Sequence, residues 1–124
     1  MPACRRGQLP TSPSRRFCAA CPGLRAPRRG SGPARELSQL PAGDIALDTE
    51  ADSFHHYRDK VCLVQLTAGD ATLLIDPLAG VSLEPLRPIL ATRARRKILH
   101  GADYDIRILH RDFALEVGSI FDTM

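Results

Sequence analysis

Apolar residues in the second two thirds of the chain occur in short runs that have the length of β-strands. Runs of about four to eight apolar or β-branched residues, bounded by turn-forming residues, are typical of buried strands. Gly69-Asp70 separates two of these runs as a hairpin turn would. The strands predicted in this way are residues 44–50, 61–68, 72–76, 97–100 and 117–121.

Two other segments carry apolar residues at the spacing of an α-helix. The first helix is expected around residues 82–90, with Ser82 as its N-cap. Pro88 should distort it, because a proline inside a helix removes a backbone hydrogen bond. The second helix is expected over residues 103–113, where Asp103 stands at the position of an N-cap. The mixture of strands and helices indicates an α/β fold.

The order of these elements predicts a mixed sheet flanked by helices. Three strands joined by short links form an antiparallel meander, whereas strands that follow helices add in parallel through right-handed crossovers. We therefore predict the strand order 3-2-1-4-5, in which residues 44–50 form the central strand. In sheets with a parallel half, binding sites form at the carboxyl ends of central strands.

The first third of the chain has a different composition. Residues 1–36 contain eight Arg, one acid and six of the ten prolines, whereas residues 37–124 contain nine Lys or Arg and thirteen acids. A segment with so little apolar periodicity cannot bury enough surface to offset the entropy of ordering. We expect a disordered Arg/Pro-rich leader over residues 1–40 and a folded domain over residues 41–124.

The leader leaves three interpretations open. Its arginines suit an organelle transit peptide or a tail that attracts RNA, and it could also be sequence upstream of the real start. No stretch of the chain approaches the ~20 apolar residues of a membrane span, and no signal-peptide apolar region is visible. We expect a soluble, cytoplasmic protein that does not bind a membrane.

Three carboxylates lie at or just after the ends of predicted strands in this topology. Asp48 and Glu50 are two apart in a strand, so they share one face of the sheet. Asp105 falls in the first turns of the helix after the neighbouring strand and is expected to lie over the same sheet end. Acids that converge repel one another unless a cation neutralises them, which suits Mg²⁺ or Mn²⁺, alone or as a pair. The alternative is that the first two acids merely end a strand and the third merely caps a helix.

The sequence resembles the ribonuclease D group of DEDD-type 3′–5′ exonucleases, which share the ribonuclease H-like fold. The resemblance covers residues 41–124 and none of the leader. It is carried by the D-T-E triplet, by an apolar strand, by an H-x4-D spacing and by a later D-T pair. These are Asp48-Thr49-Glu50, Val61-Cys62-Leu63-Val64-Gln65-Leu66, His100-Gly101-Ala102-Asp103-Tyr104-Asp105 and Phe121-Asp122-Thr123.

The resemblance implies a role for each matching acid. Asp48 would bind both metal ions of a two-metal site, Glu50 one of them, and Asp105 would complete the cage. Asp122 matches an acidic position with a supporting role. The implied reaction is attack of a metal-activated water on the terminal phosphodiester, at the 3′ end of RNA or another single-stranded nucleic acid, with release of nucleoside monophosphates.

One motif of that family has no counterpart in the sequence. The family's third motif is a tyrosine followed four residues later by a metal-binding aspartate, but Tyr57 is followed by Val61 and Tyr104 by Ile108. We therefore expect the amino-terminal part of a catalytic domain, with an incomplete metal site and severely impaired hydrolysis. A non-catalytic nucleic-acid-binding module of the same fold and a small α/β scaffold with incidental acids are the alternatives.

Other residues suggest contacts with nucleic acid. His55, His56 and Tyr57 follow the acids and could touch RNA. A solvated loop is the commoner explanation for the two histidines, and packing over the sheet edge explains the tyrosine equally well. The basic residues within 93–97 could meet phosphates, but such clusters are usually a solvated helix exit.

Overall fold

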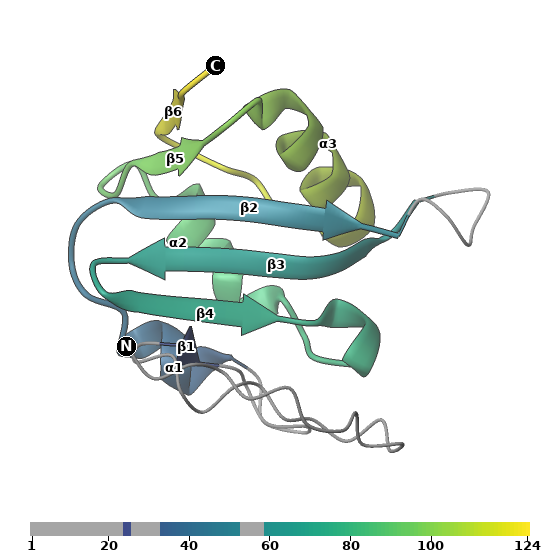
Figure 1. Cartoon of the computed structure of the whole chain (residues 1–124), viewed down its shortest axis with the longest axis horizontal. Helices are drawn as coiled ribbons and strands as arrows, with labels where there is room; N and C mark the ends of the chain where they lie inside the picture. The colour runs from purple at the N-terminus through teal and green to yellow at the C-terminus, as the bar shows by residue number, and fades with distance from the viewer. Residues whose placement is uncertain (1–23, 26–32, 53–58) are drawn as a thin grey trace, which may run out of the picture.

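The computed structural model describes residues 24–25, 33–52 and 59–124, with the backbone alone for the first pair. A single mixed sheet forms its centre, and helices and 3₁₀ turns follow the strands (Figure 1). The elements, in chain order, are β1 Leu24–Arg25, α1 Ala34–Ser38, β2 Ile45–Ala51, β3 Val61–Ala68, β4 Ala71–Ile75, the 3₁₀ turns η1 Pro77–Ala79 and η2 Glu84–Leu86, α2 Arg87–Ala91, β5 Lys97–Leu99, α3 Ala102–Phe113 and β6 Ile120–Asp122.

The sheet has the order β1-β4-β3-β2-β5-β6. Strands β2, β3 and β4 pair antiparallel as a meander, and β5 and β6 add in parallel beside β2. The predicted order 3-2-1-4-5 is therefore confirmed, and so is the central place of the strand that carries the two acids (Figure 1). The short β1, which pairs in parallel with β4 at the outer edge, lies outside that prediction.

Two of the described elements precede residue 41. Helix α1 places Leu37 in the core with only 5% of its surface exposed, and the backbone N–H of Leu37 bonds to the carbonyl of Pro33. The structure thus differs from the expected leader over residues 33–40, because one leucine on a single helical turn finds an apolar partner surface. Most of the remaining leader lies outside the described residues.

The two predicted helices differ from expectation in detail. The first is divided into η2 and α2. Its N-cap is Leu83 and not the predicted Ser82, although Ser82 Oγ accepts the backbone N–H of Glu84 at 3.2 Å. The second begins at Ala102, one residue before the predicted start. The expectation that Asp103 caps it is wrong, because the N-cap is Gly101 at φ 69° and Asp103 instead forms an ion pair with Arg107.

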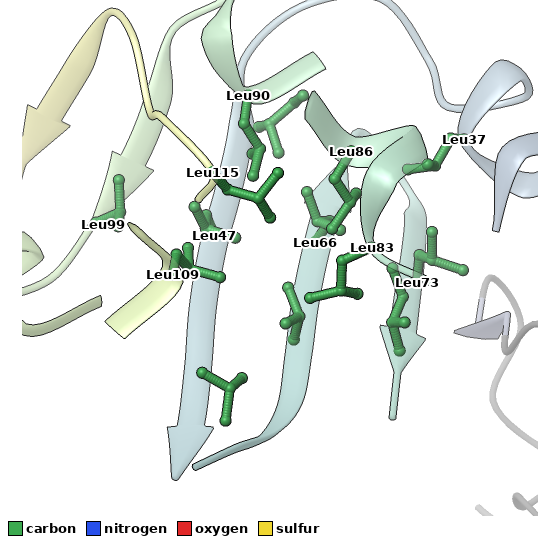
Figure 2. Packing of buried hydrophobic residues seen from close by; sticks show 14 of the residues in the cluster. Leu37, Leu47, Leu66, Leu73, Leu83, Leu86, Leu90, Leu99, Leu109 and Leu115 are labelled. Carbon is green, nitrogen blue, oxygen red and sulfur yellow. The ribbon is translucent and has the colours of Figure 1, made fainter. Parts of the chain in front are cut away.

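A cluster of leucines fills the core on one side of the sheet (Figure 2). It joins the inward side chains of the central strands to η2, α2, α3 and the chain after α3. Burying each such side chain contributes about 1.5–3 kcal/mol. Within the described residues, no helix is long and apolar enough to cross a membrane. The labelled members in Figure 2 include Leu47, Leu66, Leu86, Leu90, Leu109 and Leu115.

Candidate functional site

Strand β2 presents two acids on the side of the sheet opposite the core. Ile45, Leu47 and Thr49 are buried and alternate with exposed residues, among them Asp48 and Glu50. The shared face of the two acids is confirmed by this alternation. The pairing of β2 with β3 shifts register between Glu50 and Ala51, so the strand is irregular where the second acid stands.

Asp105 comes from the first turn of α3 and is nearly buried, with 6% of its surface exposed. Its Oδ1 accepts a hydrogen bond from the Oγ1 hydroxyl of Thr49. Burial is the main cause that raises the pKa of the Asp105 carboxyl, the hydrogen bond from Thr49 opposes this, and the negative charge of Asp48 adds to the rise. Asp48 therefore lies near enough for its charge to act on Asp105.

The donor chemistry of these residues fits a hard divalent cation, since Mg²⁺ and Mn²⁺ prefer carboxylate oxygens. Asp48 and Asp105 repel each other electrostatically, and a cation would relieve this repulsion. Yet across residues 33–52 and 59–124 no group of three His, Cys, Asp or Glu side chains lies together in a way that could hold a metal. The structure thus brings two of the predicted ligands near each other and does not gather all three.

Asp122 holds the start of the helix that carries Asp105. Its two carboxylate oxygens accept the backbone N–H groups of Gly101 at 2.9 Å and of Ala102 at 2.8 Å. The backbone N–H of Met124 also donates to it, and these three bonds, the one from Met124 first, lower the pKa of the Asp122 carboxyl. From β6, the side chain of Asp122 therefore fixes the first turn of α3.

The residues predicted to contact nucleic acid add little to the site. His55, His56 and Tyr57 lie outside the described residues, so their proposed contact with nucleic acid stays a prediction. Three members of the basic cluster make contacts within the protein. Arg95 donates to the carbonyls of Pro41 and Gly43, Arg96 pairs with Asp44 at 2.6 Å, and the buried Lys97 donates to the carbonyls of Thr92 and Arg95.

Sequence reasoning missed two features near α3. The first is the contact of Thr49 with Asp105. The two-residue period of the strand predicts that Thr49 points inward, but it does not predict which residue Thr49 contacts. The second is Asp59, which accepts hydrogen bonds from the hydroxyl of Tyr104 at 2.5 Å and from Arg111 at 3.2 Å. These bonds tie the chain before β3 to α3. No local pattern could reveal them, because Tyr104 lies 45 residues beyond Asp59.

Comparison with known families agrees with this architecture. A family model described as 3′–5′ exonuclease matches residues 33–124. Among curated proteins, the chain is similar to the exosome complex component 10 homolog of Drosophila melanogaster, with 37% identity over 89 residues, which cover 71% of this chain and 10% of that protein. It is also similar to the exosome complex exonuclease RRP6 of Saccharomyces cerevisiae, with 35% identity over 81 residues, 64% of this chain and 11% of that protein.

Solved structures give the same relationship. The chain is similar to RNase D of Escherichia coli, with a TM-score of 0.60 and 32% identity over 73% of this chain and 24% of that one. A mutant of the catalytic core of RRP6 from Trypanosoma brucei matches with a TM-score of 0.64 and 28% identity, over 73% of this chain and 25% of that one. The chain thus spans about a tenth of these curated relatives and about a quarter of these solved chains. It belongs to the 3′–5′ exonuclease family, in the group related to RNase D and RRP6.

Proposed function

We propose that the chain forms part of a metal-dependent 3′–5′ exonuclease that shortens RNA from its 3′ end. The observation that carries the proposal is the meeting of β2 and α3. Asp48 and Glu50 stand exposed on the central strand, and the buried Asp105 lies close enough for Asp48 to act on its pKa. Buried acids with raised pKa values beside a second acid are typical of catalytic sites.

In this proposal Asp48, Glu50 and Asp105 hold Mg²⁺ or Mn²⁺, in a site that the resemblance implies has two metals. Such cations activate water as a nucleophile and stabilise the charge that develops on phosphodiester oxygens. The chain's own contribution is to place the oxygen donors. Asp122 fixes the start of α3, while the exposed side of β2 leaves Asp48 and Glu50 open to a substrate.

RNA is the proposed substrate because similar proteins act on it. RNase D of Escherichia coli is described as an exoribonuclease involved in structured RNA processing, and it is 32% identical over the matched part. Release of nucleoside monophosphates, the preference for a free 3′ end and a cytoplasmic location belong to the same proposal. Each of these is a property of a whole protein, and the matched relatives are far longer than this chain.

The test uses two 5′-labelled RNAs of one sequence, one with a free 3′ hydroxyl and one with a blocked 3′ end. With Mn²⁺, we expect slow, ladder-like shortening of the free-ended RNA only, and none after Asp48→Asn. Asp70→Asn, which changes an exposed acid in the turn between β3 and β4, is the matched control and should act like the wild type. Internal cleavage, equal shortening of both RNAs, or activity that survives Asp48→Asn would contradict the proposal.

A second candidate is a nucleic-acid-binding module of the same fold without turnover. It is favoured by the lack of a three-ligand group among the described side chains. The same RNAs separate the two functions. Binding of the free-ended RNA with no shortening over long incubation would favour the module.

A further inference from the structure

Thr49 lies between the two exposed acids of β2, yet its side chain points the opposite way, toward α3. It is nearly buried, and its hydroxyl donates to Oδ1 of Asp105. From this geometry we infer that Thr49 is a positioning residue, which fixes the Asp105 carboxylate for cation binding. The inference rests on the proposed function, since it concerns a carboxylate to which that function gives a metal-binding role.

Packing alone does not explain a polar pair at this place. The neighbours of Thr49 on the inward side of β2, Ile45 and Leu47, are apolar and buried. Valine has nearly the shape of threonine and would fill the same space without a hydroxyl that needs a partner. A buried carboxylate loses its hydration, and because burial is still the largest cause acting on the pKa of Asp105, its hydrogen bonds recover only part of that loss. The pair is better explained by a role in orienting the Asp105 carboxylate.

Two contacts together restrict where the Asp105 carboxylate can lie. Asp122 fixes the backbone at the start of α3, and Thr49 then limits rotation about the side-chain bonds of Asp105. A carboxylate offers about four acceptor positions on two oxygens. The bonds from the Thr49 hydroxyl and from the backbone N–H groups of Thr49 and Asp105 therefore leave one position for a cation. Contacts that orient metal ligands in this way typically change metal affinity about 10–100-fold when they are removed.

Two substitutions separate the hydroxyl of Thr49 from its shape. Thr49→Val removes the hydroxyl and keeps the branched side chain, whereas Thr49→Ser keeps the hydroxyl and removes a methyl group. The full chain is titrated with Mn²⁺ by calorimetry. Three-bond NMR couplings across the Cα–Cβ bond of Asp105, without metal, report whether its side chain holds one rotamer. If Thr49→Val does not fold, Thr49→Ala removes the same hydroxyl and is read in the same way.

We expect Thr49→Val to weaken Mn²⁺ binding about tenfold or more and to let Asp105 populate several rotamers. Thr49→Ser should keep the wild-type affinity and a single rotamer. Wild-type affinity in Thr49→Val would overturn the inference, and so would a single Asp105 rotamer in that variant. If the wild type binds no Mn²⁺, or binds it equally after Asp48→Asn, the proposed function fails instead. The couplings then still decide whether Thr49 fixes Asp105.

Discussion

The carboxylate of Asp122 accepts a hydrogen bond from the backbone N–H of Ala102, with 2.8 Å between Oδ2 and the nitrogen. The first N–H groups of a helix have no partner within the helix. Asp122 therefore does from β6 what an N-cap side chain does from the chain just before a helix. Through this contact, the last described strand fixes the helix that carries Asp105.

We predict that Asp122→Ala lowers the thermal midpoint, and that Asp122→Asn lowers it less because one acceptor oxygen remains. Backbone N–H groups lower the pKa of Asp122 below 3.8, so the unfolded chain holds the proton more tightly. The stabilisation is therefore complete above pH 3.8 and is lost as the pH falls through the folded-state pKa. Thermal melts of wild type and Asp122→Ala at neutral and acid pH test this, and equal midpoints at neutral pH would contradict it.

The buried Asp105 should make the protein less stable than it could be. Its pKa is raised above 3.8, so between 3.8 and the folded-state pKa the folded chain keeps a proton that the unfolded chain has released. Stability should fall as the pH rises through this window. Asp105→Asn removes the charge but keeps an oxygen for the hydroxyl of Thr49. Without metal, we expect it to raise the free energy of unfolding by about 1 kcal/mol at neutral pH.

Urea denaturation of both chains at neutral pH and below pH 3.8 checks the effect of Asp105→Asn. The gain should be present at neutral pH and should fade at acid pH, where Asp105 is protonated in both states. A gain of equal size at both pH values would show that the charge is not its cause.

Leu109 anchors α3 to the sheet and has no exposed surface. We predict that Leu109→Ala costs about 2–5 kcal/mol, because the lost methyl groups leave a cavity in a packed core. Leu78, with 58% of its surface exposed, provides the same substitution outside the core. Leu78→Ala should change the free energy of unfolding by less than about 0.5 kcal/mol. Comparable losses for the two variants in urea denaturation would contradict the described packing.

Lys97 is buried in β5, although its sequence neighbours suggested a basic surface. Its Nζ donates to the carbonyl of Arg95 at 2.8 Å and to that of Thr92, and burial, followed by the charge of Arg95, lowers its pKa below 10.5. Lys97→Met keeps the length of the side chain but leaves two carbonyls without this donor. We expect a loss of about 1–3 kcal/mol in the free energy of unfolding.

The pH dependence gives an independent check on Lys97. The unfolded chain binds the lysine proton more tightly, so wild-type stability should rise with pH between the folded-state pKa and 10.5. The difference between wild type and Lys97→Met should therefore grow over that range. A difference that shrinks with rising pH would show that the folded state does not disfavour the charged amine.

Local patterns in the sequence were enough to predict the sheet but not the contacts that hold the site. The two-residue period of β2 placed Asp48 and Glu50 on one face, and the short link between β3 and β4 implied the meander. The bond from Thr49 to Asp105 spans 56 residues, and that from Ala102 to Asp122 spans 20. Such pairs are determined by how α3 docks on the sheet, which no local spacing encodes.

Two predictions from the sequence are wrong because the burial of a residue depends on what the tertiary fold packs against it. The sequence does not predict helix α1, because its five residues bury only Leu37 and a single buried residue gives no periodic pattern. The sequence predicts that Lys97 lies at a solvated helix exit, because a charged residue after two arginines normally faces water. In the fold, β5 runs beside the central β2, and this buried position places the side chain of Lys97 under nearby carbonyl groups.

Mn²⁺ titration followed by thermal melting shows whether Asp48 and Asp105 bind a divalent cation together. A ligand that binds only the folded state at 100 times its dissociation constant stabilises it by about 2.7 kcal/mol. We predict a rise of the thermal midpoint with Mn²⁺ for the wild type and for Asp70→Asn, and none for Asp48→Asn or Asp105→Asn. A midpoint that does not respond to Mn²⁺, or that rises equally in all four chains, would show that these two acids do not bind the cation together.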